Sequence, residues 1–303
     1  AITTRGYILV NENEALIKQI EKYSEKIMAV IFAIAASVSV ISVILICYFL
    51  FSNGIGAMAD IGFTNFIFGK EWRPGNDIYG IFPMILGTFY ITGGSLVIGI
   101  PLGLLMAVFL SRYCPKKIYG LVNSLVELLA GIPSIIYGFF GMVVLVPFVK
   151  NNFAGNGNSI FTAAILLGIM ILPTIISVSK AALMAVPESY YEGAVALGAT
   201  KEISIFKVMI PAAKSGITAA IALGIGRAIG ETMAVMMIAG NQPRIPESVF
   251  EGVRTLTTNI VLEMGYATDL HKEALIATGV VLFVLILIIN LFVSCFKRKR
   301  GNS

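Results

Sequence analysis

Six long apolar blocks dominate this sequence and restrict what the chain can fold into. As an α-helix rising about 1.5 Å per residue, a block of about 20 residues spans the roughly 30 Å hydrocarbon core of a bilayer. Hydrophobic residues make up 57% of the 303 residues and charged residues only 13%, which excludes a soluble enzyme and a disordered chain. We therefore predict an all-α polytopic membrane protein with six transmembrane helices. The blocks are 27–51, 83–110, 122–148, 160–178, 215–239 and 273–296.

Basic residues gather in alternate connections between these blocks, and this distribution predicts the orientation. With both termini inside, 15 of the 22 Lys and Arg residues lie on the inner side and six on the outer side, as the positive-inside rule requires. The remaining one is Arg227, inside the fifth block. Because this bias explains the net charge of +5, nucleic acid is not expected as a partner.

The blocks divide the chain into segments with different expected roles. We expect a cytoplasmic segment at 1–26, a first membrane helix at 27–51, an external loop at 52–81, a core at 82–296 containing a cytoplasmic loop at 180–214, and a basic cytoplasmic tail at 297–303. In the first segment, Lys18, Lys22 and Lys26 fall on one helix face. This spacing indicates either a short helix on the inner leaflet or a solvated helix.

The sequence offers little for catalysis or metal binding. His271 is the single histidine, and Cys47, Cys114 and Cys295 lie far apart without a CxxC motif. A His-based catalytic centre, a zinc site or a disulfide framework is therefore not expected. The sequence also lacks Gly-Lys-Ser/Thr, the core of an ATP-binding P-loop. We predict that the chain is not an enzyme and uses no cofactor.

Three charged residues, Glu127, Arg227 and Glu231, fall within the apolar blocks rather than at a block boundary. Glu127 lies near the inner end of the third block, where a structural role is favoured. Arg227 lies about 12 residues into the fifth block, near the bilayer midplane, where facing lipid would cost at least about 2.5 kcal/mol. Glu231 follows at i+4, so in one continuous helix the two side chains are neighbours. The two side chains either form a closed ion pair or line an aqueous path. In the second case the planar Arg227 guanidinium binds an anion, and Glu231 holds the arginine in place.

Small residues predict where helices touch. Gly99 and Gly103 form a GxxxG pair, and Gly226, Gly230 and Ala234 repeat this spacing in the fifth block. Such patterns are typical of helices that pack closely in lipid.

Prolines predict where helices break. Pro101 and Pro133 are expected to interrupt the second and third helices. Broken backbone at membrane depth is tolerated only inside protein or beside water, so the break at 131–134 is a candidate cavity wall.

The inner loop 180–214 carries signals for two short helices. Pro187 suits the first position of a helix, and Gly198 suits the turn that ends it. A second helix is expected to begin after Thr200 and to end before Pro211, which restarts the chain into the fifth block. Two short helices at a sharp turn form either a docking knob or a plain structured loop.

The same loop resembles the coupling loop of ABC importer permeases. That family's pattern E-A-A-x3-G-x9-I-x-L-P matches the spacing of Glu192-Gly193-Ala194, Gly198 and Val208-Met209-Ile210-Pro211, with Gly193, Val208 and Ile210 as departures. The resemblance implies the type I (MetI-like) permease fold over about residues 82–296. It also implies a coupling helix that docks on an ATPase and is shaped by Glu192, Ala194, Gly198 and Pro211.

Two membrane segments carry a closer resemblance. Residues 226–235, GRAIGETMAV, and 127–134, ELLAGIPS, resemble the fifth- and third-helix motifs of phosphate permeases of the PstC type. This resemblance implies a bacterial cytoplasmic-membrane importer in which the chain pairs with a PstA-like sister permease. Two ATP-binding subunits and an external phosphate-binding protein complete it. Arg227 and Glu231 would then lie on the pathway of phosphate.

From the residues alone, three alternatives remain open. The chemistry of Arg227 does not separate phosphate from sulfate, molybdate or phosphonate. A secondary anion carrier would need paired broken helices and usually a protonatable core site, for which Glu231 is the one candidate. A membrane-embedded enzyme would need a nucleophile–base pair that the sequence lacks.

Overall fold

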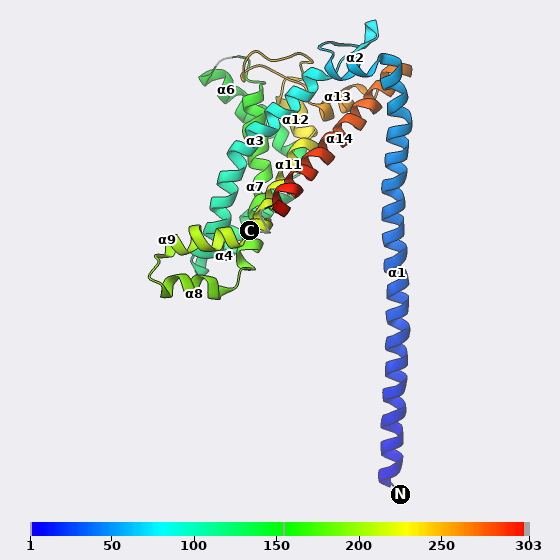
Figure 1. Cartoon of the computed structure of the whole chain (residues 1–303), viewed down its shortest axis with the longest axis vertical. Coiled ribbons are helices and arrows are strands. Elements are labelled where there is room, and N and C mark those ends of the chain that lie inside the picture. The colour runs from blue at the N-terminus through cyan, green and yellow to red at the C-terminus, as the bar shows by residue number, and fades with distance from the viewer. Residues whose placement is uncertain (1, 154, 300–303) are drawn as a thin grey trace. The chain divides into compact units, whose positions relative to one another are not determined.

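The structure of the chain, a computed structural model, is mainly helical (Figure 1). It describes residues 2–153 and 155–299, with side chains described between residues 23 and 293. Residues 1–52 and 53–303 form two separate compact units. Five helices of the described residues are long and apolar enough to cross a membrane, and the count reaches six if a helix pair bent by 71° is one span. The predicted class, an all-α polytopic membrane protein, is confirmed.

Helix α1 (Ile2–Ile61) accounts for the first unit and extends beyond it. Its apolar part, Tyr23–Ile61, is the first candidate span. The helix passes without a break through residue 26, where we expected a separate short helix to end. The side chains of Lys18, Lys22 and the tail 297–303 lie outside the described residues.

Helix α7 (Ile160–Met184) is the centre of the second unit and packs against both α3 (Phe82–Val108) and α11 (Lys214–Gly230). Gly99 and Gly103 of α3 lie against Ile171 and Ile175 of α7, so that a Cβ at either glycine would come within 3 Å of an isoleucine side chain. The predicted close packing at these two glycines is confirmed.

The expected interruption at Pro101 is wrong, because α3 runs through it and continues as the π-helix η2 (Phe109–Tyr113). A proline removes one N–H but need not end a membrane helix, since neighbouring residues can satisfy the freed carbonyl.

The third block does break where predicted, but it is not one span. Helix α4 (Lys116–Gly131) ends before Ile132 and Pro133, and α5 (Ser134–Phe140), η3 (Gly141–Leu145) and α6 (Val146–Asn152) follow. Ile132 is extended (ψ 125°), the conformation that a following proline imposes. The candidate span is Ser134–Asn152, so the predicted start at residue 122 is wrong.

The fifth block is also broken, which the sequence analysis did not predict. Helix α11 ends at Gly230, and α12 (Met233–Ile238) begins after Glu231 and Thr232. The Thr257 hydroxyl donates to the Glu231 carbonyl oxygen at 3.2 Å, and the Glu231 carboxylate accepts from the Ala234 N–H at 3.2 Å. These bonds replace helical ones, so the chain breaks here without a proline.

The predicted stripe of small residues at Gly226, Gly230 and Ala234 is therefore wrong, because these residues do not lie on one continuous helix. A Cβ added at Gly226 or Gly230 would have no described atom within 4 Å. Ala234, by contrast, lies on α12 and packs on Gly138 of α5.

Residues 187–212 form a bent projection that we call the elbow. Helix α8 (Glu188–Ala196) is followed by a turn, then by α9 (Lys201–Ile203), η4 (Ser204–Met209) and α10 (Ile210–Ala212). Gly198 has φ +86°, as its predicted turn requires, and the Thr200 hydroxyl caps α9.

Two predicted details of the elbow are wrong. Pro187 precedes α8 in an extended conformation rather than occupying its first turn. The second helix continues past Pro211, because Pro211 stands in the first turn of α10, where a missing N–H is tolerated. The chain turns instead at Ala213, before α11.

The opposite end of residues 53–303 contains a small hairpin rather than a plain loop (Figure 1). We call it the hairpin end. Its elements are α2 (Phe63–Phe68), β1 (Trp72–Arg73), η1 (Pro74–Asn76), β2 (Ile78–Tyr79), α13 (Leu256–Glu263) and the start of α14 (Asp269–Lys299). The strands pair antiparallel with Trp72 opposite Tyr79, and both side chains are buried.

Candidate functional site

Arg227 lies in the last turn of α11 and is partly buried. Its Nη1 donates a hydrogen bond to the Thr174 hydroxyl of α7 at 3.1 Å. Across the described residues, no carboxylate forms an ion pair with Arg227. The guanidinium therefore keeps most of its donors for another acceptor, and its planar fork suits an oxyanion.

Glu231 does not pair with Arg227, which corrects the expected i,i+4 pair. Because α11 ends at Gly230, Glu231 is extended (φ −70°, ψ 126°) and lies outside the helix. Its carboxylate instead caps the start of α12 through the Ala234 N–H. The structure therefore excludes a closed ion pair between Arg227 and Glu231. Thr174, and not Glu231, contacts the Arg227 guanidinium.

Two broken helices meet close to Arg227. Helices α5 and α12 pack on each other where a Cβ on Gly138 would lie 2.9 Å from Ala234 Cα. The Tyr137 hydroxyl donates to the Leu129 carbonyl oxygen at 2.8 Å, which bridges the break between α4 and α5. Breaks at 132–133 and 231–232 thus flank one interface, an arrangement tolerated in membranes only inside protein or beside water.

Sequence reasoning missed Thr174 altogether. It follows Pro173 inside the fourth apolar block, and only its polarity among apolar neighbours could have drawn attention to it.

Glu127 belongs to a local polar network. Asn123 Nδ2 donates to Glu127 Oε1 at 2.6 Å on α4, and Lys180 of α7 donates to Asn123 Oδ1. The network ties α4 to α7, as expected for a structural role.

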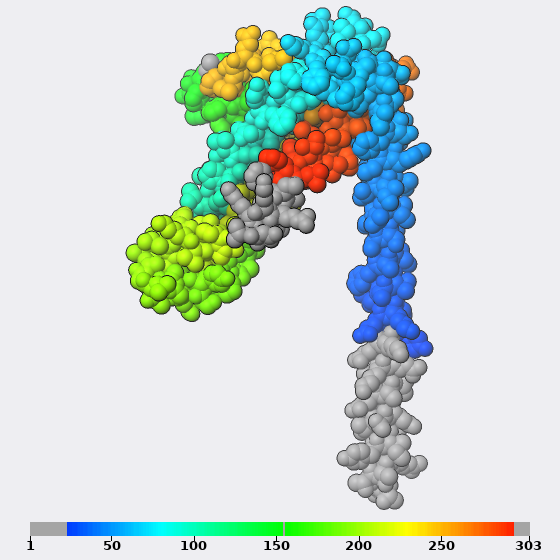
Figure 2. Space-filling view, viewed as in Figure 1, coloured from blue at the N-terminus to red at the C-terminus, as the bar shows by residue number. Residues whose placement is uncertain are grey.

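The residues expected to act in coupling all lie in the elbow. Glu192, Gly198 and Pro211 are exposed and Ala194 is partly exposed. None of the residues of α8 is buried, and Leu197 is 91% exposed. Figure 2 shows the elbow, in yellow-green, as a projecting knob. A projecting helix with exposed apolar side chains is suited to a protein partner.

Sequence reasoning missed a buried cluster of polar groups at the hairpin end, which we call the Glu263 cluster. Its five residues are Trp72, Arg254, Asn259, Glu263 and His271. Trp72 Nε1 donates to Glu263 Oε2 at 2.8 Å, and His271 Nε2 lies 2.8 Å from the same oxygen. Arg254 Nη1 pairs with Glu263 Oε1 and bonds Asn259 Oδ1 at 3.0 Å.

The electrostatics of this cluster favour a charged carboxylate. The Glu263 side chain is 8% exposed. Burial alone raises the pKa of Glu263, but hydrogen bonds from Trp72, His271 and Arg254 together outweigh it, so its pKa lies below the ordinary value. The cluster joins β1, α13, α14 and the segment before α13, and the Glu263 carboxylate accepts from three of its side chains.

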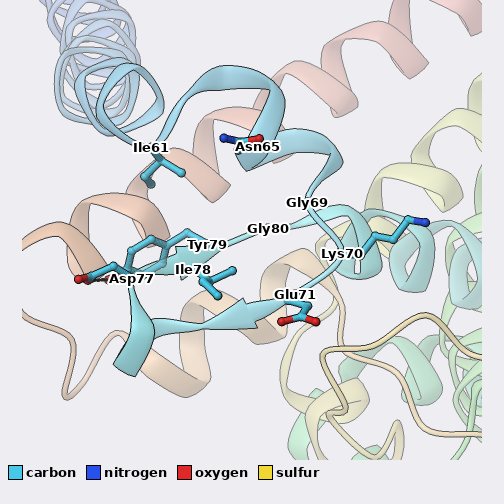
Figure 3. Close-up of a pocket in the computed structure, with 9 residues that line it drawn as sticks. All are labelled: Ile61, Asn65, Gly69, Lys70, Glu71, Asp77, Ile78, Tyr79 and Gly80. Atoms are coloured by element: carbon cyan, nitrogen blue, oxygen red, sulfur yellow. Dashed lines mark hydrogen bonds between the residues drawn. The ribbon is translucent and has the colours of Figure 1, made fainter.

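A neighbouring pocket at the hairpin end is lined by both basic and acidic side chains (Figure 3). It has a volume of about 380 Å³ and is lined by Lys70, Glu71, Asp77, Tyr79 and residues of α2. The Tyr79 hydroxyl donates to Asp77 at 3.2 Å, and Glu71 pairs with Arg73 at 3.4 Å. Two carboxylates beside one lysine disfavour a negatively charged ligand.

Metal chemistry has no visible basis in the part of the chain that the structure describes. No group of three or more His, Cys, Asp or Glu side chains there could hold a metal ion.

A solved bacterial transporter shares this fold. The structure of a bacterial ABC transporter involved in the import of the acidic polysaccharide alginate matches with a TM-score of 0.61 and 17% sequence identity. The match covers 88% of this chain and 95% of that chain, and at this identity it shows the fold alone.

The sequence identifies the family. Residues 99–302 match the family described as "Binding-protein-dependent transport system inner membrane component", and the chain belongs to it. It is 35% identical over 306 residues to the probable ABC transporter permease protein YqgH of Bacillus subtilis, covering 99% of each. It is also 36% identical over 261 residues to the phosphate transport system permease protein PstC of Mesorhizobium japonicum, covering 79% of this chain and 80% of that protein.

Proposed function

We propose that this chain is the permease subunit through which an ATP-driven importer passes phosphate across the bacterial cytoplasmic membrane. The observation that carries the proposal is Arg227, a guanidinium with no carboxylate partner among the described residues, beside two broken helices. The similarity to PstC proteins supports phosphate over other oxyanions.

In this proposal the hairpin end faces outward and the elbow faces the cytoplasm. The distribution of Lys and Arg supports this orientation, with both termini inside. An external phosphate-binding protein delivers phosphate at the hairpin end. The pathway lies between this chain and a PstA-like sister permease, and two ATP-binding subunits dock on the elbow.

ATP hydrolysis takes place on those separate subunits in this account. Closure of the ATPase pair pushes on the elbow and switches access from outside to inside. Arg227 meets phosphate in transit, while Glu231 keeps the break between α11 and α12 in place by capping α12.

Co-expression with a sister permease and an affinity-tagged ATPase tests the assembly. The unmodified chain should co-purify with the ATPase. Gly198→Val should weaken recovery of the ATPase, because a residue with a Cβ at φ +86° costs about 1 kcal/mol or more. The cost comes from the backbone conformation and not from a clash, since no described atom lies within 4 Å of the added Cβ. Gly193→Ala is the matched control, since Gly193 lies in α8 with no atom within 4 Å of a built Cβ. Failure of the unmodified chain to bind any ATPase would refute the proposal.

Competition in proteoliposomes tests the substrate. Labelled phosphate should be taken up only with ATP and with the phosphate-binding protein present. Unlabelled phosphate should compete, and sulfate or molybdate should not. Uptake of sulfate or molybdate in place of phosphate would support an ATP-driven importer but would show that its substrate is a different oxyanion.

A further inference from the structure

One arginine, Arg112, joins three segments at the elbow. It lies in η2, which continues α3. Its Nη1 donates to Glu188 Oε2 at 2.7 Å, and its Nη2 donates to the Leu183 carbonyl oxygen at 3.4 Å. Leu183 lies in the last turn of α7, and Glu188 is the first residue of α8. One guanidinium therefore spans the connection between a membrane helix and the elbow.

The next residue of η2 contacts the other arm of the elbow. Lys201 Nζ, at the start of α9, lies 4.3 Å from the centre of the Tyr113 ring. This is a cation–π contact. Adjacent residues of η2 thus hold the starts of both α8 and α9.

An apolar cluster lies beneath these polar contacts. It brings together Val108 of α3, Leu183 and Val186 around the end of α7, and Ile205 and Met209 of η4, all of them buried. Because packed interiors have low compressibility and transmit strain, this cluster connects the elbow mechanically to the end of α3.

The arginine is retained although it is imperfectly satisfied. Its side chain is 14% exposed, and its Nε is buried with no hydrogen-bond partner in the described part of the chain. A buried donor without an acceptor destabilises a fold. The Glu188 side chain is 57% exposed, and such partly exposed pairs contribute little to stability. The Arg112–Glu188 pair is therefore expected to make only a small contribution to stability.

We propose that Arg112 is a positioning residue that passes movement of the elbow to α3. Its guanidinium ties the start of α8 to the end of α3, so displacement of the elbow by an ATPase shifts α3 and the helices packed on it. This inference rests on the proposed function, because it requires an ATPase docked on the elbow.

The test is the coupling ratio, phosphate imported per ATP hydrolysed, in proteoliposomes containing the complete transporter. Arg112→Gln and Glu188→Gln should each assemble with the ATPase and keep basal ATP hydrolysis. Each should lower the coupling ratio by about 5- to 10-fold, within the roughly 2- to 30-fold by which substitutions between two coupled sites change their coupling. The double variant should be no worse than either single one, since both remove the same contact. Lys117→Gln, an exposed neighbour in α4, should leave the ratio unchanged.

A normal coupling ratio in assembled Arg112→Gln would overturn the inference. Loss of ATPase recovery in Arg112→Gln together with normal coupling in Glu188→Gln would also overturn it, because the arginine would then only stabilise the elbow. A failure of the proposed function is distinct, since the unmodified transporter would then show no ATP-dependent uptake.

Discussion

Two arginines of this permease, Arg254 and Arg227, are held in opposite ways. Arg254 is 13% exposed and bonds the Glu263 carboxylate, Asn259 Oδ1 and the Asn241 carbonyl oxygen. Arg227 makes a single hydrogen bond, to the hydroxyl of Thr174, and lacks a carboxylate partner among the described residues. The first is held by three acceptors of its own chain. The second retains donors without an acceptor among the described residues.

In the proposed function, this difference separates a charge that stabilises the fold, Arg254, from a charge that serves transport, Arg227. A buried pair is strongly destabilised when one partner is removed, because the remaining charge is left uncompensated. An arginine without a partner leaves no such charge behind when it is replaced. Substitutions at the two sites should therefore affect different measurements, stability at one and uptake at the other.

The largest expected effect on stability is at the Glu263 cluster. Glu263→Gln removes the carboxylate that pairs with buried Arg254 and should lower stability by about 3–5 kcal/mol. Thermal unfolding in detergent measures this loss. The matched control is Glu71→Gln, which removes an exposed pair with Arg73 and should cost at most about 1 kcal/mol. Equal effects of the two substitutions would remove the distinction between the two regions.

Acid should produce a related but smaller effect at the same cluster. Because the folded-state pKa of Glu263 is lowered, its contribution to stability is fully present above its ordinary pKa of 4.5 and is lost as pH falls through the folded pKa. The stability difference between the unmodified chain and Glu263→Gln should therefore be constant above pH 4.5 and shrink below it. A difference that shrinks instead between pH 6 and pH 8 would show that another group controls the cluster.

The smallest expected effect is at Thr174. Among the described residues, Thr174→Val removes the one side-chain hydrogen bond of the Arg227 guanidinium. It should lower phosphate uptake by about 2- to 13-fold, from the roughly 0.5–1.5 kcal/mol that one hydrogen bond contributes. Thr218→Val is the control, because the Thr218 hydroxyl bonds only the Lys214 carbonyl oxygen within α11. Equal uptake in the two variants would show that Thr174 does not position the guanidinium.

Hydrophobic blocks and proline or glycine signals predicted much of this fold. The spans around α3, α7 and α14, the break at Pro133 and the turn at Gly198 all depend on local properties of the chain. Local patterns are enough for such features because the physical cause lies within a few residues.

Features that depend on tertiary contacts were not predicted. The break after Gly230 depends on a bond from Thr257, 26 residues away, and the Glu263 cluster joins Trp72 to Glu263 across 191 residues. The i,i+4 rule placed Glu231 beside Arg227 only on the assumption of a continuous helix. The sequence placed Arg227 inside an apolar block, where the structure leaves it partly buried, but it did not indicate the contact with Thr174.

The most direct test of the account is phosphate uptake by Arg227 variants in the assembled transporter. Arg227→Gln should lower phosphate uptake by at least about 100-fold. Loss of one hydrogen-bond donor that stabilises a negative charge in an enzyme site has an effect of this size. Arg227→Lys should retain part of it, because the charge stays while the fork is lost. Glu231→Gln should remain active, since its amide oxygen can still cap α12, and Arg227→Gln with Glu231→Gln should remain inactive. Near-normal uptake by assembled Arg227→Gln, with or without Glu231→Gln, would contradict the claim that Arg227 meets the anion.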